Sequence, residues 1–584
     1  MFKLFKNFSK KDCGIIIFCI ILICFQVWLD LKLPDYMSNI TTLLQKGTDV
    51  SEILEQGFYM LLCAGGSLAS AISVGYFASY LSSSFSRTIR KKIFDKVQSF
   101  SMEEIKMFST SSLITRTTND VSNMEMIIGM GLQLLIKAPI TAIWAICKIL
   151  DKGWQWSAIT GVAVIILLIM VITLMIIVLP RFKIVQKLID NINGFIRENL
   201  KGIRVVRAFN AEGYQEEKFE KGNIKLTNTQ LFNQRTMAIM QPVMYLVMNT
   251  LTLAIYFVGA HLIEEAAMFD KITIFSNMVV FTSYAMQVIM SFLMLAVIFI
   301  MYPRASVSAE RINEVLDTDS KILDGDVSED NYLEGEVEFR NVSFKYPDSS
   351  EYILKDISFV ARKGETVAFI GSTGSGKSTL INLVPRFYDV TDGEVLINGV
   401  NVKNYKLEHL HNKLGYVPQK AVMFNGSIKY NVSYGDSGKN ITIDKVKEAI
   451  KVAQGKEFVE KMTNGYDSNI AQGGTNVSGG QKQRLAIARA IAKDPEIYIF
   501  DDSFSALDYK TDYLLRNELK KYTKDATCLI VAQRIGTIIN ADKILVLDHG
   551  VCVGMGTHKE LLKNCNIYKE IAYSQLSKEE LENE

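Results

Sequence analysis

A glycine-rich loop between a buried strand and a helix constrains the fold of this chain more than any other stretch. The loop is Gly371-x4-Gly376-Lys377-Ser378; an apolar run, 367–370, precedes it, and residues 380–384 continue with helical spacing. This order is that of a phosphate-binding loop, whose backbone N–H groups hold anionic oxygens at a helix N-terminus. In such a loop the ammonium of Lys377 suits the outer phosphates, and the hydroxyl of Ser378 suits Mg²⁺. The sequence therefore predicts a site for a nucleoside triphosphate.

The first half of the chain carries six apolar runs, each long enough to cross a bilayer. They span about 14–31, 57–80, 127–150, 156–180, 237–263 and 276–302. The second, fourth, fifth and sixth runs contain no Asp, Glu, Lys or Arg, which is rare for buried helices of a soluble protein. We expect an all-α membrane domain over 1–320 and an α/β domain over 321–584. The net charge is +2, so charge alone suggests no nucleic-acid partner.

The distribution of lysine and arginine sets the expected orientation. These residues gather before the first run and in the segments 81–126 and 181–236, whereas the loops after the first and fifth runs hold few of them. Because positive residues stay on the cytoplasmic side, we expect both termini in the cytoplasm. The two basic segments are long and periodic, which predicts helices that extend into the cytoplasm. Each has a break that suits a short transverse helix, near 108–120 and near 211–216, with a plain linker as the alternative.

Four ionisable side chains fall within the apolar runs or at their ends. Asp30, Lys148 and His261 lie near the ends of runs, where snorkelling towards the interface is the simpler interpretation. Lys137, close to Pro139, lies deeper. An ionisable group at membrane depth is a functional hypothesis by default, so Lys137 is the better candidate for a water-filled pathway.

Further motifs follow the phosphate-binding loop or precede it in a fixed order. They are Tyr346-Pro347, Tyr416-Val-Pro-Gln419, Val477-Ser-Gly-Gly-Gln481, Ile497-Tyr-Ile-Phe-Asp501-Asp502, Ser505-Ala-Leu-Asp508 and Ala532-Gln533-Arg534. With six spans in front of it, this set resembles that of an ABC exporter half-transporter, over essentially the whole chain. The Ser-Gly-Gly-Gln signature is the most specific element, because other phosphate-loop ATPases lack it. The resemblance implies six transmembrane helices with long cytoplasmic extensions, then an α/β phosphate-loop ATPase domain with a helical subdomain.

The resemblance also implies which residues bind ATP and Mg²⁺. The ring of Tyr346 would stack on adenine, with strand-end packing as the alternative. Gln419 and Asp501 would join Ser378 around Mg²⁺, and the signature would close over the γ-phosphate held by a second nucleotide-binding domain. The expected nucleotide-binding residues are Tyr346, Gly371, Ser372, Thr373, Gly374, Ser375, Gly376, Lys377, Ser378, Thr379, Gln419, Ser478, Gly479, Gly480, Gln481 and Asp508.

Two catalytic positions depart from the family pattern. Where the family has a glutamate that polarises the attacking water, this sequence has Asp502, which is one methylene shorter. A displacement of roughly 1 Å can cost on the order of 10²-fold in rate. Where the family has a switch histidine, this sequence has Gln533, whose amide cannot exchange a proton near neutral pH. With a nearly intact signature, the chain is similar to the degenerate-site subunit of a heterodimeric exporter.

The resemblance implies an ATP-driven exporter subunit that moves an amphiphilic, drug-like or lipid-like substrate out of the cytoplasm by alternating access. Its expected place is the inner (plasma) membrane of a bacterium, and its expected partner is a second half-transporter. Two alternatives remain open: a homodimer that hydrolyses ATP slowly through Asp502, and a regulatory or channel-like membrane protein that nucleotide binding gates.

Overall fold

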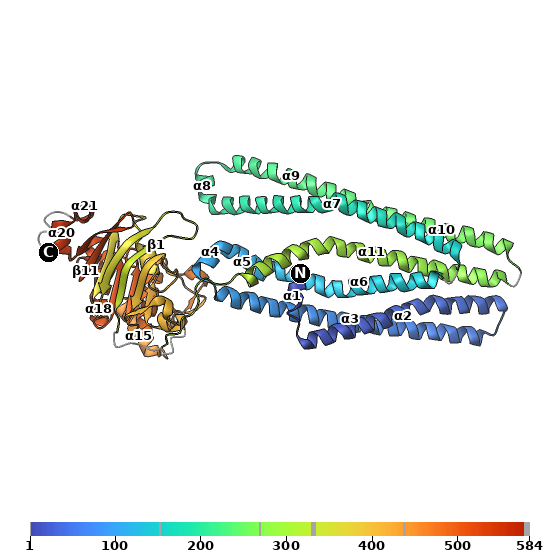
Figure 1. The fold of residues 1–584 in the computed structure, drawn as a ribbon, viewed down its shortest axis with the longest axis horizontal. Coiled ribbons are helices and arrows are strands. Elements are labelled where there is room, and N and C mark those ends of the chain that lie inside the picture. The colour runs from blue at the N-terminus through green and yellow to red at the C-terminus, as the bar shows by residue number, and fades with distance from the viewer. Residues whose placement is uncertain (1, 151–152, 268–269, 329–333, 436–439, 577–584) are drawn as a thin grey trace. The chain divides into compact units, whose positions relative to one another are not determined.

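The structure, a computed structural model, describes residues 2–150, 153–267, 270–328, 334–435 and 440–576. The chain divides into two compact units (Figure 1). The helical unit comprises Met1–Gln98 and Ser109–Thr318, and the sheet unit comprises Ser99–Phe108 and Asp319–Glu584. The end of the predicted second domain, 577–584, lies outside the described residues.

Long helices build the helical unit. They are α2 (Lys10–Lys46), α3 (Val50–Gln98), α6 (Asn119–Leu150), α7 (Trp154–Lys201), α9 (Glu212–Ala238), α10 (Met240–Glu265) and α11 (Asp270–Asp317), with the short α1 (Phe2–Phe5), α5 (Thr110–Thr117) and α8 (Ile203–Ala208). Among the described residues, six helical stretches are long and apolar enough to cross a membrane. Five of them cover the first five predicted runs, and the sixth covers the run 276–302 as far as Leu295. The predicted membrane all-α bundle is confirmed.

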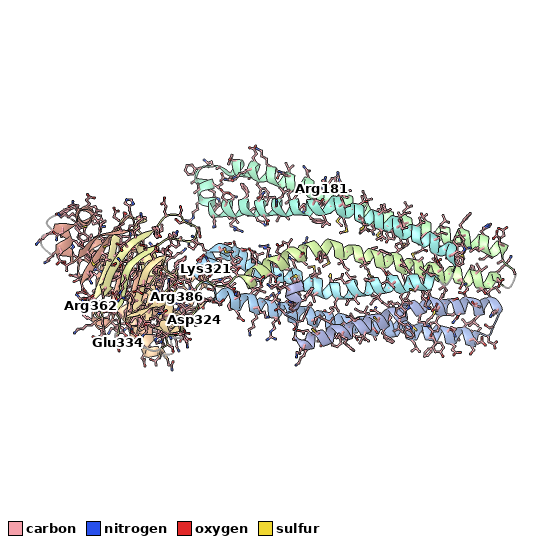
Figure 2. The ribbon with its side chains drawn as sticks, viewed as in Figure 1. Arg181, Lys321, Asp324, Glu334, Arg362 and Arg386 are labelled. Carbon is pink, nitrogen blue, oxygen red and sulfur yellow. The ribbon has the colours of Figure 1, made fainter. Side chains whose placement is uncertain are left out.

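The segments predicted to extend into the cytoplasm are helical. α7 and α9 run side by side and are joined by α8 (Figure 1). The guanidinium of Arg181 lies 3.5 Å from the ring centroid of Phe232 and so ties the two helices together (Figure 2). A short helix, α5, lies within the first predicted range, 108–120. The second was misplaced by several residues: the short helix is α8, and Ala211 instead caps the start of α9.

Helix α2 runs further than the apolar run that predicts it. A capping box between Ser9 and Asp12 starts the helix, and Gly47, with φ +69°, ends it. Pro34 lies inside the helix, where its missing N–H is tolerated in a membrane-spanning segment. As a result, Asp35, four residues beyond the predicted end of the first run, is part of the spanning helix.

The sheet unit is an α/β domain, as predicted. Its six-stranded sheet has the order β12-β11-β3-β10-β9-β6, in which β12 alone pairs antiparallel to its neighbour. These strands are β3 (Thr366–Gly371), β6 (Leu414–Val417), β9 (Ile497–Asp501), β10 (Thr527–Val531), β11 (Lys543–Asp548) and β12 (Val551–Gly556). A four-stranded antiparallel sheet, β2-β1-β4-β5, comprises β1 (Val337–Phe344), β2 (Leu354–Ala361), β4 (Asp392–Ile397) and β5 (Val400–Asn401).

Helices accompany the sheets of this unit. They include α4 (Met102–Phe108), α12 (Lys377–Asn382), α13 (Leu407–Asn412), α14 (Ile428–Val432), α15 (Ile443–Val452), α16 (Lys456–Glu460), α17 (Gly479–Lys493), α18 (Tyr509–Tyr522), α19 (Ile535–Ile538), α20 (His558–Asn564) and α21 (Asn566–Gln575). The run α14–α17, which also contains the short β7–β8 pair (Gly426–Ser427 with Asn469–Ile470), forms the predicted helical subdomain.

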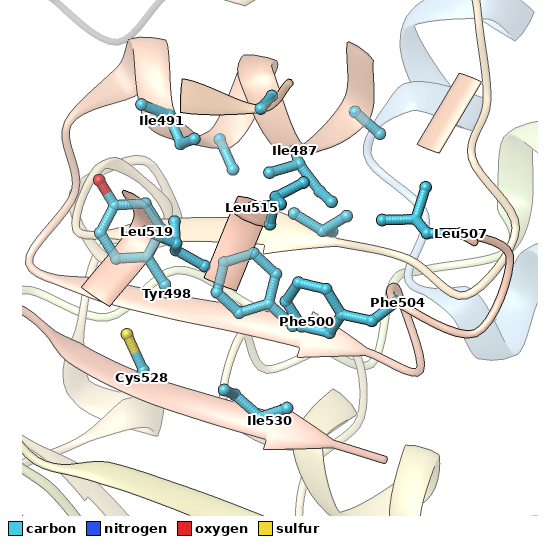
Figure 3. Packing of buried hydrophobic residues seen from close by; sticks show 14 of the residues in the cluster. Ile487, Ile491, Tyr498, Phe500, Phe504, Leu507, Leu515, Leu519, Cys528 and Ile530 are labelled. Atoms are coloured by element: carbon cyan, nitrogen blue, oxygen red, sulfur yellow. The ribbon is translucent and has the colours of Figure 1, made fainter. Parts of the chain in front are cut away.

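A continuous hydrophobic core fixes the strands that carry the candidate site. Phe500 of β9 and Ile530 of β10 pack beneath Ile487 of α17 and Leu515 of α18 (Figure 3). All five residues of β9 are buried, and so are all five of β10. The carboxyl ends of these strands, where Asp501 lies, are therefore held in place by packing rather than by the loops that follow.

Candidate functional site

The predicted phosphate-binding loop joins β3 to α12. Gly371 must be a glycine, because a Cβ there would lie 2.0 Å from the carbonyl oxygen of Leu547. Gly376, with φ +95°, caps the N-terminus of α12 in the left-handed region that favours glycine. Residues 372–374 form the exposed crest of the loop. The loop thus presents its backbone to solvent at a helix N-terminus, as phosphate binding requires.

Lys377 lies folded against its own loop. Its ammonium donates to the carbonyl oxygens of Gly371, at 2.8 Å, and Ser372, at 2.7 Å. Burial lowers the pKa of Lys377, while the carboxylates of Asp502 and Asp501 act in the opposite direction. These bonds to neutral carbonyls leave the positive charge without a direct ion-pair partner within its loop, which suits an anionic ligand.

Ser378 and Asp501 meet across the loop and the end of β9. The hydroxyl of Ser378 donates to Oδ1 of Asp501 at 2.8 Å. Burial raises the pKa of Asp501, and the bond from Ser378 opposes that shift. Hydroxyl and carboxylate oxygens are the ligands that Mg²⁺ prefers, so the two side chains fit the ion that the sequence predicts here.

Asp502 is held by the amides of two glutamines. Its Oδ2 accepts a hydrogen bond from Nε2 of Gln419, at 3.1 Å, and another from Nε2 of Gln533, at 2.8 Å. The backbone of Asp502 has φ +45°, which is uncommon for a residue with a side chain and clusters at functional sites. The structure thus unites residues separated by more than 100 positions in the sequence. We call Lys377, Ser378, Gln419, Asp501, Asp502 and Gln533 the nucleotide cluster.

Tyr346 follows β1 and lies beside the loop. Its hydroxyl lies 3.0 Å from Oγ1 of Thr379, and either oxygen can be the donor. Its ring meets the ring of Phe344 at 82° and that of Tyr388 at 88°. The ring is therefore fixed in orientation next to α12, where the resemblance places the adenine-stacking residue.

The signature residues lie at the start of α17. Ser478 caps the helix by accepting from the N–H of Gln481, and the Gln481 side chain accepts from the N–H of Ser478. Gly480 lies close to the segment before α18, since a Cβ there would be 3.3 Å from the carbonyl oxygen of Ala506. Asp508 caps α18 by accepting from the N–H of Thr511, and this bond lowers the pKa of the Asp508 carboxyl. The hydrogen bonds of Ser478 and Gln481 join them to each other rather than to the nucleotide cluster.

Comparisons with known proteins agree with this geometry. Residues 16–318 match the family described as ABC transporter transmembrane region, and residues 354–505 match the family described as ABC transporter. The chain belongs to the ABC transporter family. It is an ATP-hydrolysing transporter chain with one transmembrane region and one ATPase domain, and half-transporters of this family dimerise and work in the lipid bilayer.

Several relatives span nearly the whole chain. An uncharacterized ABC transporter ATP-binding protein of Mycobacterium tuberculosis is 39% identical over 530 residues, which is 90% of each chain. One of Bacillus subtilis is 36% identical over 88% of each chain. An ATP-dependent lipid A-core flippase of Pseudomonas aeruginosa is 31% identical over 88% of this chain and 83% of the relative. The structure of a bacterial Atm1-family ABC exporter with ATP bound has the same fold, with a TM-score of 0.81 at 23% identity, over 96% of this chain and 97% of that chain.

Within the helical unit of this ABC transporter, opposite charges pair between two spanning helices. Nζ of Lys137 lies 3.1 Å from Oδ2 of Asp30, and Nζ of Lys148 lies 3.1 Å from Oδ2 of Asp35. The hydroxyl of Tyr284, on α11, donates to Oδ1 of Asp35 at 2.7 Å. We call these five residues the membrane charge seam. It joins α2 to α6 and to α11.

Neutral side chains complete the seam. Ser67, on α3, donates to Oδ1 of Asp30, and the amide of Gln287, on α11, donates to the Asp30 carbonyl at 3.4 Å. The seam changes two interpretations made from the sequence. Lys137 has an acidic partner, and Asp30 and Lys148 have partners within the bundle instead of reaching alone for the interface. His261 pairs with Glu265 on an exposed face of α10.

Sequence reasoning missed Asp35 and Tyr284. Asp35 lies four residues beyond the predicted end of the first run, whereas the helix itself continues through Pro34 to Lys46. A usable signal was charge balance: the first and third spans cross the membrane in the same direction, so two carboxylates on α2 can face Lys137 and Lys148 on α6. The hydroxyl of Tyr284 left no comparable signal in the sequence.

Proposed function

We propose that this chain is the subunit of a heterodimeric ABC exporter that carries a degenerate, poorly hydrolysing ATP site. The observation that carries the proposal is the hydrogen bonding of Asp502, whose Oδ2 accepts from both Gln419 and Gln533. Two amides therefore occupy the oxygen that a general base would turn towards the attacking water.

The chemistry of these side chains supports weak hydrolysis. Asp502 is one methylene shorter than the glutamate of the family pattern, and a shortfall of roughly 1 Å can cost on the order of 10²-fold in rate. Gln533 stands where the family has a histidine, and an amide neither gains nor loses a proton near neutral pH. ATP binding has a complete set of groups: Lys377 for the phosphates, and Ser378, Asp501 and the neighbouring Gln419 for Mg²⁺, which would supply charge neutralisation at the phosphates.

The signature supports a productive role in a dimer. Ser478, Gly479, Gly480 and Gln481 stand at the N-terminus of α17, where the helix dipole favours an anion. In the proposed dimer they complete the site of the partner, which keeps the glutamate and the histidine. Hydrolysis there resets both subunits, while this chain's own site binds ATP and contributes to domain closure.

The proposed substrate is an amphiphile taken from the cytoplasmic side of the plasma membrane. Support comes from the six membrane-spanning helices and from a relative that is named as a lipid A-core flippase. The basic residues of the inter-span segments support a topology with both termini in the cytoplasm.

The deciding experiment measures steady-state ATPase activity of the purified chain alone and co-purified with its partner. We expect little activity from the chain alone and fast turnover from the pair. The double variant Asp502→Glu/Gln533→His of the chain alone is expected to hydrolyse on the order of 10²-fold faster. Asp444→Glu, which adds a methylene to an exposed aspartate of α15, is the matched control.

Two outcomes would overturn parts of the proposal. Robust turnover by the unmodified chain alone would show a homodimer that works through Asp502. ATP-dependent conductance without substrate accumulation in inverted vesicles would show a nucleotide-gated channel instead of a pump.

A further inference from the structure

Helix α4 belongs to the sheet unit although it follows α3, a membrane-spanning helix, in the chain. The first turn of α4 is anchored to the sheet unit. The carboxylate of Glu104, only 3% exposed, accepts from the N–H of Ser101 at 2.8 Å and from the N–H of Lys321 at 3.3 Å. The ammonium of Lys321, which is labelled in Figure 2, forms an ion pair with the carboxylate of Glu103. The helix is thus held on the sheet unit by groups close to its N-terminus.

The other end of α4 reaches the candidate base site. Nζ of Lys106 lies 3.0 Å from Oδ2 of Asp348 and 5.3 Å from the ring centroid of Tyr346. The hydrogen bond to Asp348 raises the pKa of Lys106, so its charge is retained near neutral pH. A cation within about 6 Å of an aromatic centroid is attracted by the ring face. Lys106 therefore makes two contacts with the segment that follows β1, an ion pair with Asp348 and a cation–π contact with Tyr346.

The ring of Tyr346 is held in one orientation by its neighbours. Phe344 and Tyr388 meet it nearly at right angles, and its hydroxyl is bonded to Thr379. A stacked purine needs direct van der Waals contact with a ring face, and so does an ammonium placed over that ring. Two ligands cannot cover the same face at once.

We propose that Lys106 and the base of a bound nucleotide compete for one face of Tyr346, so that base binding releases α4 from this contact. The inference rests on the proposed role of Tyr346 in base stacking. In this inference Lys106 is a positioning residue. Binding of a base changes its contact on α4, and α4 is connected through the chain to α3. Because the coupling is reciprocal, removing Lys106 must tighten nucleotide binding.

Binding of Mg-ADP and of inorganic pyrophosphate to the purified full chain tests the competition. ADP carries a base but no γ-phosphate, so domain closure does not obscure the result. Lys106→Ala is expected to tighten ADP about two- to fivefold, the size of an exposed cation–π contact, and to leave pyrophosphate unchanged. Lys345→Ala is the matched control, because its ammonium lies 5.5 Å from the ring centroid of Tyr352. Weaker or unchanged ADP binding by Lys106→Ala would overturn the inference.

A second variant separates this inference from the function proposed above. Tyr346→Ala is expected to weaken ADP and leave pyrophosphate unchanged, since stacking on an aromatic ring is lost. If Tyr346→Ala leaves ADP unchanged, the proposed base-stacking role fails. If Tyr346→Ala weakens ADP while Lys106→Ala does not tighten it, only the competition fails.

Hydrogen exchange of the backbone amides of α4 gives a readout that needs no variant. Saturating Mg-ADP is expected to speed exchange over 102–108, whereas saturating pyrophosphate is expected to leave it unchanged. Slower or unchanged exchange at saturating ADP would contradict release of the helix.

Discussion

The nucleotide cluster and the membrane charge seam satisfy their charged groups in opposite ways. In the cluster, neutral donors and acceptors hold each charge: carbonyls hold Lys377, a hydroxyl holds Asp501 and two amides hold Asp502. In the seam, Lys137 and Lys148 each meet a carboxylate. The difference follows from whether a ligand or solvent can replace the hydrogen-bonding partners of each site. The cluster can trade its hydrogen bonds for phosphate oxygens, whereas a bilayer offers the seam no replacement partner.

The largest expected effect comes from breaking one charge pair of the seam. Lys137→Met leaves the carboxylate of Asp30 without a counter-charge inside the spanning region. The pair is only partly buried within the protein, with side-chain exposures of 26% and 27%. An unpaired charge in a spanning helix still costs up to about 3 kcal/mol, so we expect a clear loss of thermal stability in detergent micelles.

A double variant sharpens that test. Asp30→Leu combined with Lys137→Met removes both charges, and we expect most of the lost stability to return. Lys221→Met, which breaks an exposed pair with Glu217 on α9, is the control and should leave the unfolding temperature unchanged. A double variant as unstable as Lys137→Met would show that the two side chains act independently.

The corresponding change in the nucleotide cluster should spare stability and remove binding. Lys377→Ala loses charge-assisted hydrogen bonds to phosphate, and we expect ATP affinity to fall about 10- to 100-fold. The unfolding temperature should change little, because the carbonyls that Lys377 contacts belong to a loop whose crest is open to water. Nucleotide binding and thermal melts on one preparation measure both; unchanged affinity would exclude this loop as the site.

The smallest effect is expected from the neutral member of the seam. Tyr284→Phe removes the hydroxyl that donates to Asp35 but leaves Lys148 in place. One lost hydrogen bond contributes about 1 kcal/mol, well below the cost of an unpaired charge. If Tyr284→Phe lowers the unfolding temperature as much as Lys137→Met does, Tyr284, rather than Lys148, is the main partner of Asp35.

The two sites also differ in how far the sequence predicts them. The phosphate-binding loop is contiguous, and an apolar strand leads directly to Asp501, so the local sequence pattern was sufficient to predict both. The bonds from Gln419 and Gln533 to Asp502 depend on side-chain directions that no spacing specifies. The seam depends on helices brought together from positions 113 residues apart, for Asp35 and Lys148, and on a helix that continues through Pro34. The existence of the spans was predictable for all six helices, whereas charge balance was the one sequence signal for pairing between spans, and it does not specify which side chains meet.

The capping box of α17 has a consequence for the working cycle. Ser478 and Gln481 already satisfy each other's backbone N–H groups. In the proposed dimer, these side chains would exchange the bonds of the cap for bonds to the partner's nucleotide and gain little net free energy. A closed pair of ATPase domains built on this exchange would be easily reopened. The proposed signature contact would then favour repeated turnover over permanent assembly, because the helix cap is restored when the domains separate.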